Sequence, residues 1–380
     1  MDSVLREIID RIQASTADRT PLRIRGGGSK DFYGQALHGE LLEVGGLSGI
    51  ISFEPSELVV TVRAGTPLAE LEAALADKGQ SLAFEPPHFN TTTSYGLPTC
   101  GGMVAAGLSG PARANAGAVR DFVLGATLIN GRGEQLTFGG QVIKNVAGYD
   151  VSRLMVGAMG TLGVLTELSI KVLPSASAEA TLVFAMDQAS ALTQLHKWGG
   201  QPLPLNASCW VRDHTAPGNP ELLFVRLRGA AAAVEYACKK MTHDVPATRI
   251  ENAVAAPDWQ ACRDMQLPFF TNPNPASLAL WRLSLPQTAP ALNLPWPQLV
   301  EWHGAQRWLW APPQAHEQLR QTAAQLGGTA TIFRAPAQYD ASDCPRFSPL
   351  QSPLGRIHQQ LKAEFDPAGI FNPGRLYAEF

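Results

Sequence analysis

Thiol pairs and long apolar runs are both missing from this 380-residue sequence. Its five cysteines are scattered, and no two of them form a C-x-x-C pair. Zinc and iron–sulfur sites usually take several thiolates from such short motifs, so no metal site of this kind is indicated. Scattered cysteines are typical of buried, reduced thiols in a cytoplasmic protein. No run of about 18 apolar residues occurs, so we expect no membrane-spanning helix.

Charge of one sign and the common catalytic motifs are lacking as well. Lys and Arg total 30 against 33 Asp and Glu, and no basic block is present, which argues against nucleic-acid binding. The sequence contains no G-x-x-x-x-G-K-[ST] phosphate loop, no H-E-x-x-H zinc motif and no G-x-S-x-G nucleophile elbow. The eight histidines are dispersed, so no metal-binding spacing is indicated.

Composition divides the chain into regions. Residues 20–174 are rich in glycine and β-branched residues and contain no tryptophan, whereas all eight tryptophans lie between Trp198 and Trp310. The length suits two or three domains. We therefore predict a first domain over 1–175, a second over 176–345 and a C-terminal segment over 346–380. Residues 1–15 carry apolar side chains at helical spacing between charges, which indicates an amphipathic helix rather than a signal peptide.

The first region alternates between strand and helix patterns. Residues 58–65 predict a strand, and residues 66–79 a helix with Thr66 as its cap and Gly79 at its end. Residues 122–138 predict a hairpin that turns at Asn130–Gly131, and residues 163–173 a half-buried strand. The middle region follows a β-α-β-β-α-β order, which is typical of an antiparallel sheet with helices on one face. The predicted fold class is α+β.

Four glycine-bearing stretches stand out. They are "RGGGSKDFYG" (25–34), "GLPTCGGMVAAGLSGPARANAGAVRDFVLG" (96–125), "KNVAGYDVSRLMVGAMGTLGVLTE" (144–167) and "FDPAGIFNPGRLY" (365–377). Glycine allows backbone angles that other residues avoid and lets another molecule approach the main chain closely. Any one stretch could be a tight turn, but four of them are hard to attribute to turns alone.

In these stretches the chain resembles the FAD-binding family of the vanillyl-alcohol oxidase type (PCMH type), which includes the FAD-linked 2-hydroxy-acid dehydrogenases. The phrase "FEPPHF" (84–89) and the last two stretches resemble, within that family, the FAD-binding E subunits of bacterial glycolate oxidase. The likeness is specific over residues 20–174 and the last 16 residues. It implies a two-subdomain PCMH-type FAD-binding domain, a smaller ferredoxin-like α+β cap domain, and a C-terminal segment that returns to the flavin.

The resemblance also implies which residues hold FAD. The first glycine-rich turn would bind the pyrophosphate, since consecutive main-chain N–H groups suit an anion; its residues are Arg25, Gly26, Gly27, Gly28, Ser29 and Lys30. Further contacts would come from Pro98, Thr99, Cys100, Gly101 and Gly102, from Ser109, Gly110 and Arg113, from Tyr149, Asp150, Gly160, Thr161, Gly163 and Val164, and from Asn372 and Arg375. An arginine near the pyrimidine side of the ring would stabilise anionic reduced flavin. Alternatively, Asp150 caps the next helix and Arg375 is a surface residue on a turn.

Two departures from the family patterns bear on mechanism. Relatives with covalent FAD often attach it through a histidine in the first glycine-rich loop, where this chain has Ser29–Lys30–Asp31, so we expect non-covalent FAD. The 2-hydroxy-acid dehydrogenases carry a histidine-rich metal motif worded like G-D-G-N-x-H, and this chain has none. We therefore predict no metal site and assign no catalytic residue on this chain.

The resemblance favours an FAD-binding subunit of a glycolate oxidase (glycolate dehydrogenase) complex. Glycolate would be oxidised to glyoxylate with electrons passed through flavin. The implied partners are a catalytic FAD subunit and an iron–sulfur subunit, and these partners could hold the chain at the inner face of the membrane. The tryptophan-rich region would be either an interaction surface or a buried core.

Two other functions are open from the sequence. One is an independent FAD-linked dehydrogenase of a small 2-hydroxy acid, which needs a general base; His303 and Tyr149 are the candidates. The other is a scaffold that keeps the fold but has lost flavin. The glycine-rich loops disfavour the scaffold, on the argument that only a ligand needs so much open backbone.

Overall fold

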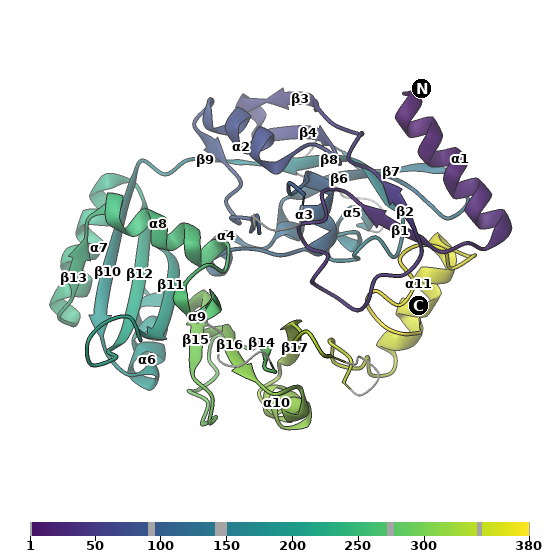
Figure 1. Cartoon of the computed structure of the whole chain (residues 1–380). Helices are drawn as coiled ribbons and strands as arrows, with labels where there is room; N and C mark the ends of the chain where they lie inside the picture. Colours follow the sequence, from purple (N-terminus) through teal and green to yellow (C-terminus); the bar gives the residue numbers. More distant parts are fainter. Residues whose placement is uncertain (1, 90–95, 141–149, 272–276, 340–343, 380) are drawn as a thin grey trace. The chain divides into compact units, whose positions relative to one another are not determined.

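The computed structural model describes residues 2–89, 96–140, 150–271, 277–339 and 344–379. They form two compact units (Figure 1). Unit 1 combines Met1–Ser109, Ala118–Ser175 and Pro349–Phe380, so it takes residues from both ends of the chain. Unit 2 combines Ala176–Ser348 with the short segment Gly110–Gly117, which lies within the first region of the sequence but groups with the second unit.

A five-stranded antiparallel sheet forms the centre of unit 1. Its strands follow the order β3 (Ile50–Glu54), β4 (Val59–Arg63), β8 (Val164–Lys171), β6 (Val123–Ile129) and β7 (Gln135–Gly139). The predicted strands and the predicted hairpin are confirmed, and alternate residues of β8 are buried toward its end. The hairpin loop is longer than two residues, because the Asn130 side chain accepts hydrogen bonds from the N–H groups of Arg132 and Glu134.

Helices pack around this sheet. The predicted N-terminal helix is confirmed as α1 (Ser3–Asp18), which buries Ile8 and Ile12. The helix predicted over 66–79 is α2 (Leu68–Ala76), but Thr66 is not its cap. The Thr66 hydroxyl is held instead by the main chain of Gly49, and Pro67 directly precedes the helix. Unit 1 also contains α3 (Cys100–Ala106), α5 (Val151–Leu154) and the pair β5 (Gln80–Ser81) and β9 (Leu173–Pro174).

The C-terminal segment completes unit 1. Strand β1 (Leu22–Arg25) pairs in parallel with β2 (Glu40–Glu43), and Leu22 also forms a parallel bridge with Phe371. The Leu22 N–H donates to the Ile370 carbonyl at 2.7 Å, and the Asn372 N–H donates to the Leu22 carbonyl at 2.9 Å. Figure 1 shows the C-terminal segment in yellow, with the end of the chain beside β1, in purple; α11 (Leu354–Phe365) precedes it, and its Phe365 carbonyl accepts a hydrogen bond from the Gly131 N–H of the β6–β7 hairpin. Leu22 and Phe371 are fully buried in one cluster with α1, so both chain ends share a core.

Unit 2 contains one eight-stranded antiparallel sheet. Its order is β13 (Thr248–Ile250), β10 (Ala178–Ala185), β12 (Glu221–Gly229), β11 (Leu205–Arg212), β15 (Gln298–Glu301), β16 (Gln306–Ala311), β14 (Ala279–Ser284) and β17 (Thr329–Arg334). Strands β10 to β13, with α6 (Gln188–Gly199) and α7 (Ala231–Asp244), form one ferredoxin-like half. Strands β14 to β17 repeat that strand order with α10 (His316–Gln325) alone, and β11 pairs with β15 to join the halves.

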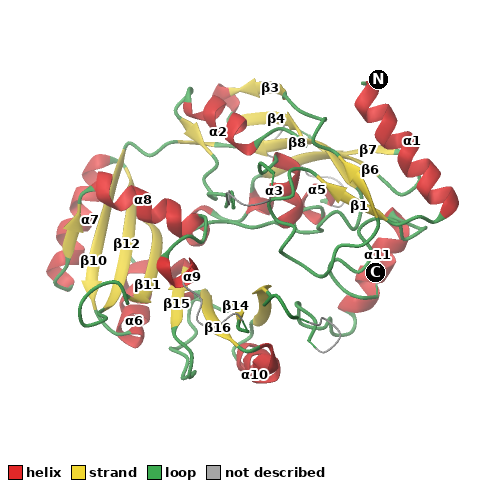
Figure 2. Ribbon diagram, viewed as in Figure 1, coloured by secondary structure: helices red, strands yellow, loops and turns green. Residues whose placement is uncertain are grey.

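Helices cover both faces of this sheet, not one face as the sequence predicts. Leu182 of β10 packs in the cluster that includes α6 and α7. The adjacent Thr181 accepts a hydrogen bond at 3.0 Å from Nε1 of Trp259 on α8 (Asn252–Arg263). Because successive side chains of a strand point to opposite faces, α8 covers the other face (Figure 2). Pro257 inside α8 breaks the helical pattern, which is why sequence analysis does not predict this helix.

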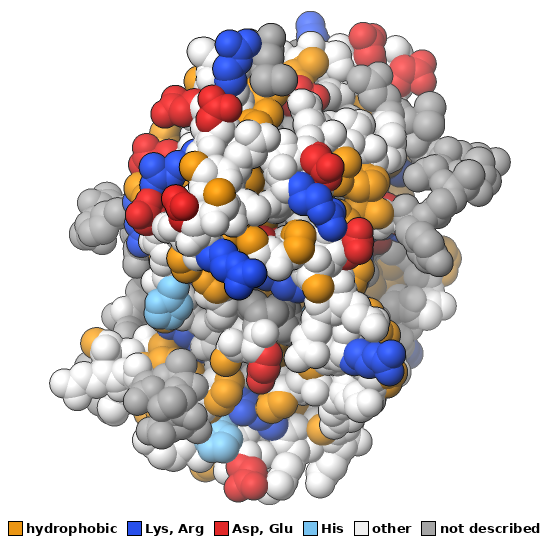
Figure 3. All heavy atoms as spheres, turned by 90° about the vertical axis from the view of Figure 1, so that its right-hand side faces the viewer, with side chains coloured by type: hydrophobic (Ala, Val, Ile, Leu, Met, Phe, Trp, Pro, Cys, Tyr) orange, Lys and Arg blue, Asp and Glu red, His pale blue; other side chains and the backbone are white. Residues whose placement is uncertain are grey.

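The tryptophans and cysteines of the chain are core residues. Six tryptophans are buried, and Trp296 and Trp310 are half-buried, so the buried-core alternative is confirmed for those six side chains. All five cysteines are free and buried, as predicted. The face in Figure 3 carries acidic and basic side chains interspersed with apolar ones. Within the described ranges, no helix is both long enough and apolar enough to cross a bilayer.

Replacement of Phe371 tests how far the C-terminal segment stabilises unit 1. Its ring is fully buried, so Phe371→Ala should lower the free energy of unfolding by about 3–5 kcal/mol. Chemical denaturation followed by circular dichroism measures the loss. Tyr236→Ala is the control, because that side chain is 61% exposed and its loss should cost no more than about 0.5 kcal/mol. Equal effects of the two substitutions would contradict a stabilising role for the segment.

Candidate cofactor-binding site

The glycine-rich turn directly follows β1. The Asp31 N–H donates to the Gly28 carbonyl at 3.0 Å, and Gly28 has a φ of 74°, which glycine adopts readily. Among the residues that the structure describes, none accepts a hydrogen bond from the N–H groups of Gly27, Gly28 or Ser29. These three consecutive residues line a pocket with about 580 Å³ of empty space. Such a row of main-chain donors can bind an anion.

The protein itself also requires glycine in this turn. A Cβ on Gly26 would lie 2.4 Å from Oγ1 of Thr99, and a Cβ on Gly27 would lie 1.6 Å from the carbonyl oxygen of Leu97. Residues 96–99 therefore need glycine opposite them with or without a ligand. At these two positions the neighbouring chain explains the glycine, so the prediction that only a ligand needs so much open backbone is wrong there. The main-chain donors that find no acceptor in the described chain are the stronger sign of a bound anion.

Three cationic side chains and one carboxylate surround the turn. Nε of Arg25 lies 3.2 Å from Oδ2 of Asp31. Nζ of Lys30 donates to the Ser29 hydroxyl at 3.2 Å. The third cation, Arg375, lines the same pocket. The local charge is therefore positive, which favours an anionic ligand such as a phosphate group.

Arg375 is a buried clamp on the chain that follows the turn. It is 6% exposed, and its guanidinium donates to the main-chain carbonyls of Asp31 at 3.0 Å and of Tyr33 and Gln35. The Gln35 N–H donates in return to the Arg375 carbonyl at 2.9 Å. The alternative interpretation of Arg375 as a surface residue is therefore wrong, because the side chain is buried and its guanidinium orients residues 31–35 through their carbonyls.

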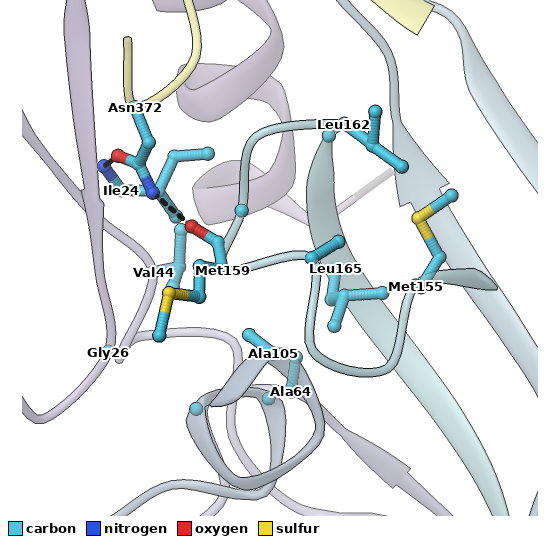
Figure 4. A pocket seen from close by; sticks show the side chains of 15 residues that line it. Ile24, Gly26, Val44, Ala64, Ala105, Met155, Met159, Leu162, Leu165 and Asn372 are labelled. Carbon is cyan, nitrogen blue, oxygen red and sulfur yellow. Dashed lines mark hydrogen bonds between the residues drawn. The ribbon is translucent and has the colours of Figure 1, made fainter. Parts of the chain in front are cut away.

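Asn372 connects β1 with the loop 158–163. Its Oδ1 accepts a hydrogen bond from the Ile24 N–H at 2.8 Å, and its Nδ2 donates to the Met159 carbonyl at 2.6 Å (Figure 4). Asn372 has a φ of 40°, a left-handed conformation that asparagine tolerates better than most residues. Its side chain thus fixes the distance between two walls of the site.

A second pocket is mostly apolar, and the space between its walls, counted out to the open solvent, is about 550 Å³. It shares wall residues with the first pocket, namely Ile24, Gly26, Gly102, Ala105, Met159 and Asn372. Figure 4 shows the side chains of Met155, Met159, Leu162 and Leu165 around it. Such walls suit a flat aromatic ring, whereas the glycine-rich turn suits phosphate.

The two pockets bring together many residues of the predicted site. Those that line one pocket or both are Arg25, Gly26, Gly27, Gly28, Ser29, Lys30, Thr99, Gly101, Gly102, Gly160, Gly163, Asn372 and Arg375. Those that line neither of these two pockets are Pro98, Cys100, Ser109, Gly110, Arg113, Asp150, Thr161 and Val164. Tyr149 lies outside the described residues.

Several residues of the second group have structural roles. Cys100 is fully buried, and burial raises the pKa of its thiol to about 12. Val164 is fully buried in the core of unit 1. The Asp150 side chain accepts a hydrogen bond from the Arg153 N–H at 3.1 Å, so it caps α5 as the alternative interpretation predicts.

Gly110 and Arg113 belong to unit 2, where they pack on Trp302. The Gly110 carbonyl accepts a hydrogen bond from Nε1 of Trp302 at 2.9 Å, and the guanidinium carbon of Arg113 lies 4.6 Å from the centre of the indole ring. Trp302 and His303 both have a φ of 54°, which costs energy for residues other than glycine. The packing of Gly110–Gly117 helps to hold this strained pair in place.

His303 is poorly suited to act as a general base. Its Nδ1 lies 3.0 Å from the Ser208 hydroxyl, and burial lowers the pKa of the imidazole to about 4. A base with this pKa is far weaker than the near-neutral base that proton abstraction at pH 7 favours. Tyr149, the other candidate base, cannot be placed for the reason given above. In the part of the chain that the structure describes, no three His, Cys, Asp or Glu side chains gather as possible metal ligands.

The imidazole of His303 should make stability depend on pH. Its folded pKa of about 4 lies below the ordinary value of 6.5, so the unfolded chain binds the proton more readily between these values. This group should leave the free energy of unfolding unchanged above pH 6.5 and lower it by up to about 3 kcal/mol as the pH falls to 4. Denaturation at both pH values measures the fall, which should be smaller in His303→Gln. An equal fall in the variant would contradict the depressed pKa.

Part of the apolar pocket was not predicted from the sequence. The wall residues not predicted include Ile24, Val44, Ala64, Ala105, Met155, Ala158, Met159, Leu162 and Leu165. All six of those after position 100 lie inside the quoted glycine-bearing stretches, so their place in the motifs could have indicated them. Val44 and Ala64 lie next to ordinary strands, and no sequence signal separates them from core residues.

Comparison with known proteins agrees with this geometry. The FAD binding domain family matches residues 5–139, a range that contains the glycine-rich turn and α3. The fold is similar to a solved structure of 4-ethylphenol oxidase from Gulosibacter chungangensis, with a TM-score of 0.70, 12% identity, and coverage of 99% of this chain and 88% of that chain. At this identity the likeness concerns the fold alone.

Two curated relatives are more similar in sequence. The chain is 31% identical over 148 residues to glycolate oxidase subunit GlcD of Bacillus subtilis (strain 168), which covers 39% of this chain and 30% of that protein. It is 44% identical over 372 residues to glycolate oxidase subunit GlcE of Escherichia coli (strain K12), which covers 98% of this chain and 97% of that protein. Because the second match spans nearly the whole of both proteins, this chain carries an FAD-binding domain and belongs to the glycolate oxidase subunit GlcE family of FAD-linked oxidoreductases.

Proposed function

We propose that the chain is the FAD-binding subunit of a glycolate oxidase complex, in which glycolate is oxidised to glyoxylate. The observation that carries this proposal is the 44% identity to a glycolate oxidase subunit over 98% of the chain. The partners are a catalytic FAD subunit of the GlcD type and an iron–sulfur subunit. Attachment to the inner face of the membrane through these partners is part of the same proposal.

The residues of unit 1 fit FAD. The N–H groups of Gly27, Gly28 and Ser29 would hold the pyrophosphate, because they have no acceptor among the described residues and cations lie nearby. The apolar pocket around Met155 and Leu165 would take the flavin ring. FAD binds non-covalently in this proposal, since Ser29, Lys30 and Asp31 stand where covalent relatives often carry a histidine.

Bound flavin would accept a pair of electrons and pass them on singly, which suits a position between an organic substrate and iron–sulfur clusters. The chain's own residues bind and orient it. Arg375 places residues 31–35 beside the turn through their carbonyls, and Asn372 fixes β1 against the loop 158–163. The apolar walls limit the access of water to the ring. Catalysis on the partner subunit agrees with the low basicity of His303.

Substitution of Gly27 tests the pyrophosphate turn. A Cβ there would lie 1.6 Å from the Leu97 carbonyl, so Gly27→Ala must displace the turn and misplace its donors. Loss of two charge-assisted hydrogen bonds should raise the dissociation constant for FAD about a hundredfold. Titration of FAD into the apoprotein measures this. Gly199→Ala is the control, because its added Cβ would meet no atom within 4 Å. Unchanged affinity in Gly27→Ala would contradict the assigned role of the turn.

An absorbance spectrum tests the function. The purified chain should show bound flavin, and anaerobic glycolate should not bleach it until the GlcD-type and iron–sulfur subunits are added. Bleaching of the chain alone would place substrate oxidation on this chain and overturn the division of labour. Failure of glycolate to bleach the complete complex would contradict glycolate as the substrate. A colourless chain that also fails to take up added FAD would refute the flavin site.

A further inference from the structure

The helix α11 buries a lysine. Lys362 is 6% exposed, and it is the only residue of α11 that is buried among those described. Burial lowers the pKa of its ammonium group, and the neighbouring Asp366 opposes that shift. A buried charge is costly unless each of its donors finds an acceptor. This lysine was not predicted as a site residue, since a single lysine in an amphipathic helix carries no sequence signal.

All three donors of the Lys362 ammonium group are used. Nζ donates to Oδ2 of Asp366 at 2.6 Å, to the Phe371 carbonyl at 2.7 Å and to the Thr161 carbonyl at 2.8 Å. Asp366 also accepts from the N–H groups of Ile370 and Phe371. The pair therefore joins three pieces of chain: α11, the C-terminal turn and the loop 158–163. A buried ion pair is by itself weak evidence for stability, so its role needs another explanation.

The loop 158–163 is held at two of its carbonyls. The Asn372 side chain donates a hydrogen bond to the Met159 carbonyl, and Lys362 donates one to the Thr161 carbonyl. In a trans peptide the C=O of one residue and the N–H of the next point in opposite directions. The Gly160 N–H therefore points away from Asn372, and the Leu162 N–H points away from Lys362.

These two N–H groups are available for a ligand. Gly160 and Leu162 both line the apolar pocket. Within the described ranges, neither N–H group has an acceptor. Leu162 is buried, with only 8% of its surface exposed, so water does not readily replace the missing acceptor. A buried main-chain donor without an acceptor is unusual in a folded protein. A bound cofactor at the pocket would supply the missing acceptors.

We propose that Lys362 is a positioning residue for the cofactor: by holding the Thr161 carbonyl, it turns the Leu162 N–H toward an acceptor atom of FAD. The ion pair with Asp366 keeps the ammonium group charged and aimed. This proposal rests on the FAD-binding part of the proposed function and is independent of glycolate and of the partner subunits.

Amide hydrogen exchange of the full-length chain tests the proposal. In the wild type, saturating FAD should slow exchange of the Leu162 amide about tenfold, because the amide gains an acceptor. In Lys362→Met the Thr161 carbonyl loses its hydrogen bond, so the peptide plane between Thr161 and Leu162 is free to turn. FAD should then bind about tenfold more weakly, and at saturation the slowing at Leu162 should be lost. A merely structural lysine would alter stability without removing the FAD-dependent slowing at this amide.

Lys240→Met is the matched control. Lys240 forms an ion pair with Asp244 at the same spacing of four residues, at 2.7 Å, but lies in unit 2. The Lys240→Met substitution should leave both the affinity for FAD and the hydrogen exchange of the Leu162 amide unchanged. Persistence of the slowing in Lys362→Met would overturn the proposal.

Circular dichroism would show whether the Lys362→Met variant fails to fold. In that case the test is the hydrogen exchange of the wild-type chain, and the absence of FAD-dependent slowing at the Leu162 amide would overturn the proposal. A chain that passes this test but is not reduced by glycolate in the complete complex would refute the proposed substrate alone.

Discussion

The attachment of residues 370–372 to strand β1 is the constraint on which the rest of the site depends. The hydrogen bond between Asn372 and Ile24 joins positions 348 residues apart, so both chain ends must meet before the site exists. Closing such a loop costs entropy. Burial of Phe371 and Leu22 in a shared core offsets that cost. Once this contact forms, Asn372 and Arg375 reach the two sides of the glycine-rich turn, and Lys362 reaches the loop 158–163.

Main-chain groups and side chains have different roles in the site. In the proposed site, the groups that would face the cofactor are main-chain N–H groups in the turn at 27–29 and in the loop around Gly160 and Leu162. The side chains of Asn372, Arg375 and Lys362 bond mainly to carbonyls of the chain and so act through the peptide planes that they fix. Preorganised donors of this kind need little rearrangement when a ligand binds.

The sequence predicts the local features of this protein better than its long-range contacts. Hydrophobic spacing predicts α1, β8 and the hairpin β6–β7 because their burial patterns repeat over short distances. Strand β15 escapes prediction because two of its four residues, Gln298 and Glu301, are polar yet buried. Burial raises the pKa of the Glu301 carboxyl group. This carboxyl group accepts hydrogen bonds from Trp308 and Gln306, partners that only the folded sheet brings together.

The same distinction applies to the site. The family motifs in the sequence predict the glycine-rich turn and the C-terminal residues Asn372 and Arg375 as site residues, and each of these lines a pocket. They do not show that Gly27 faces the Leu97 carbonyl, or that Val164 and Cys100 point into the core, because neighbours across the fold decide this. Lys362 could not be found from the sequence, since its role depends on a contact with Thr161 some 201 positions away.

A structure of the full chain with FAD bound would test the central claim most directly. The account predicts pyrophosphate oxygens within hydrogen-bonding distance of the N–H groups of Gly27, Gly28 and Ser29, with the flavin ring in the apolar pocket beside Met155 and Leu165. Pyrophosphate bound elsewhere, with those three N–H groups hydrated instead, would contradict it.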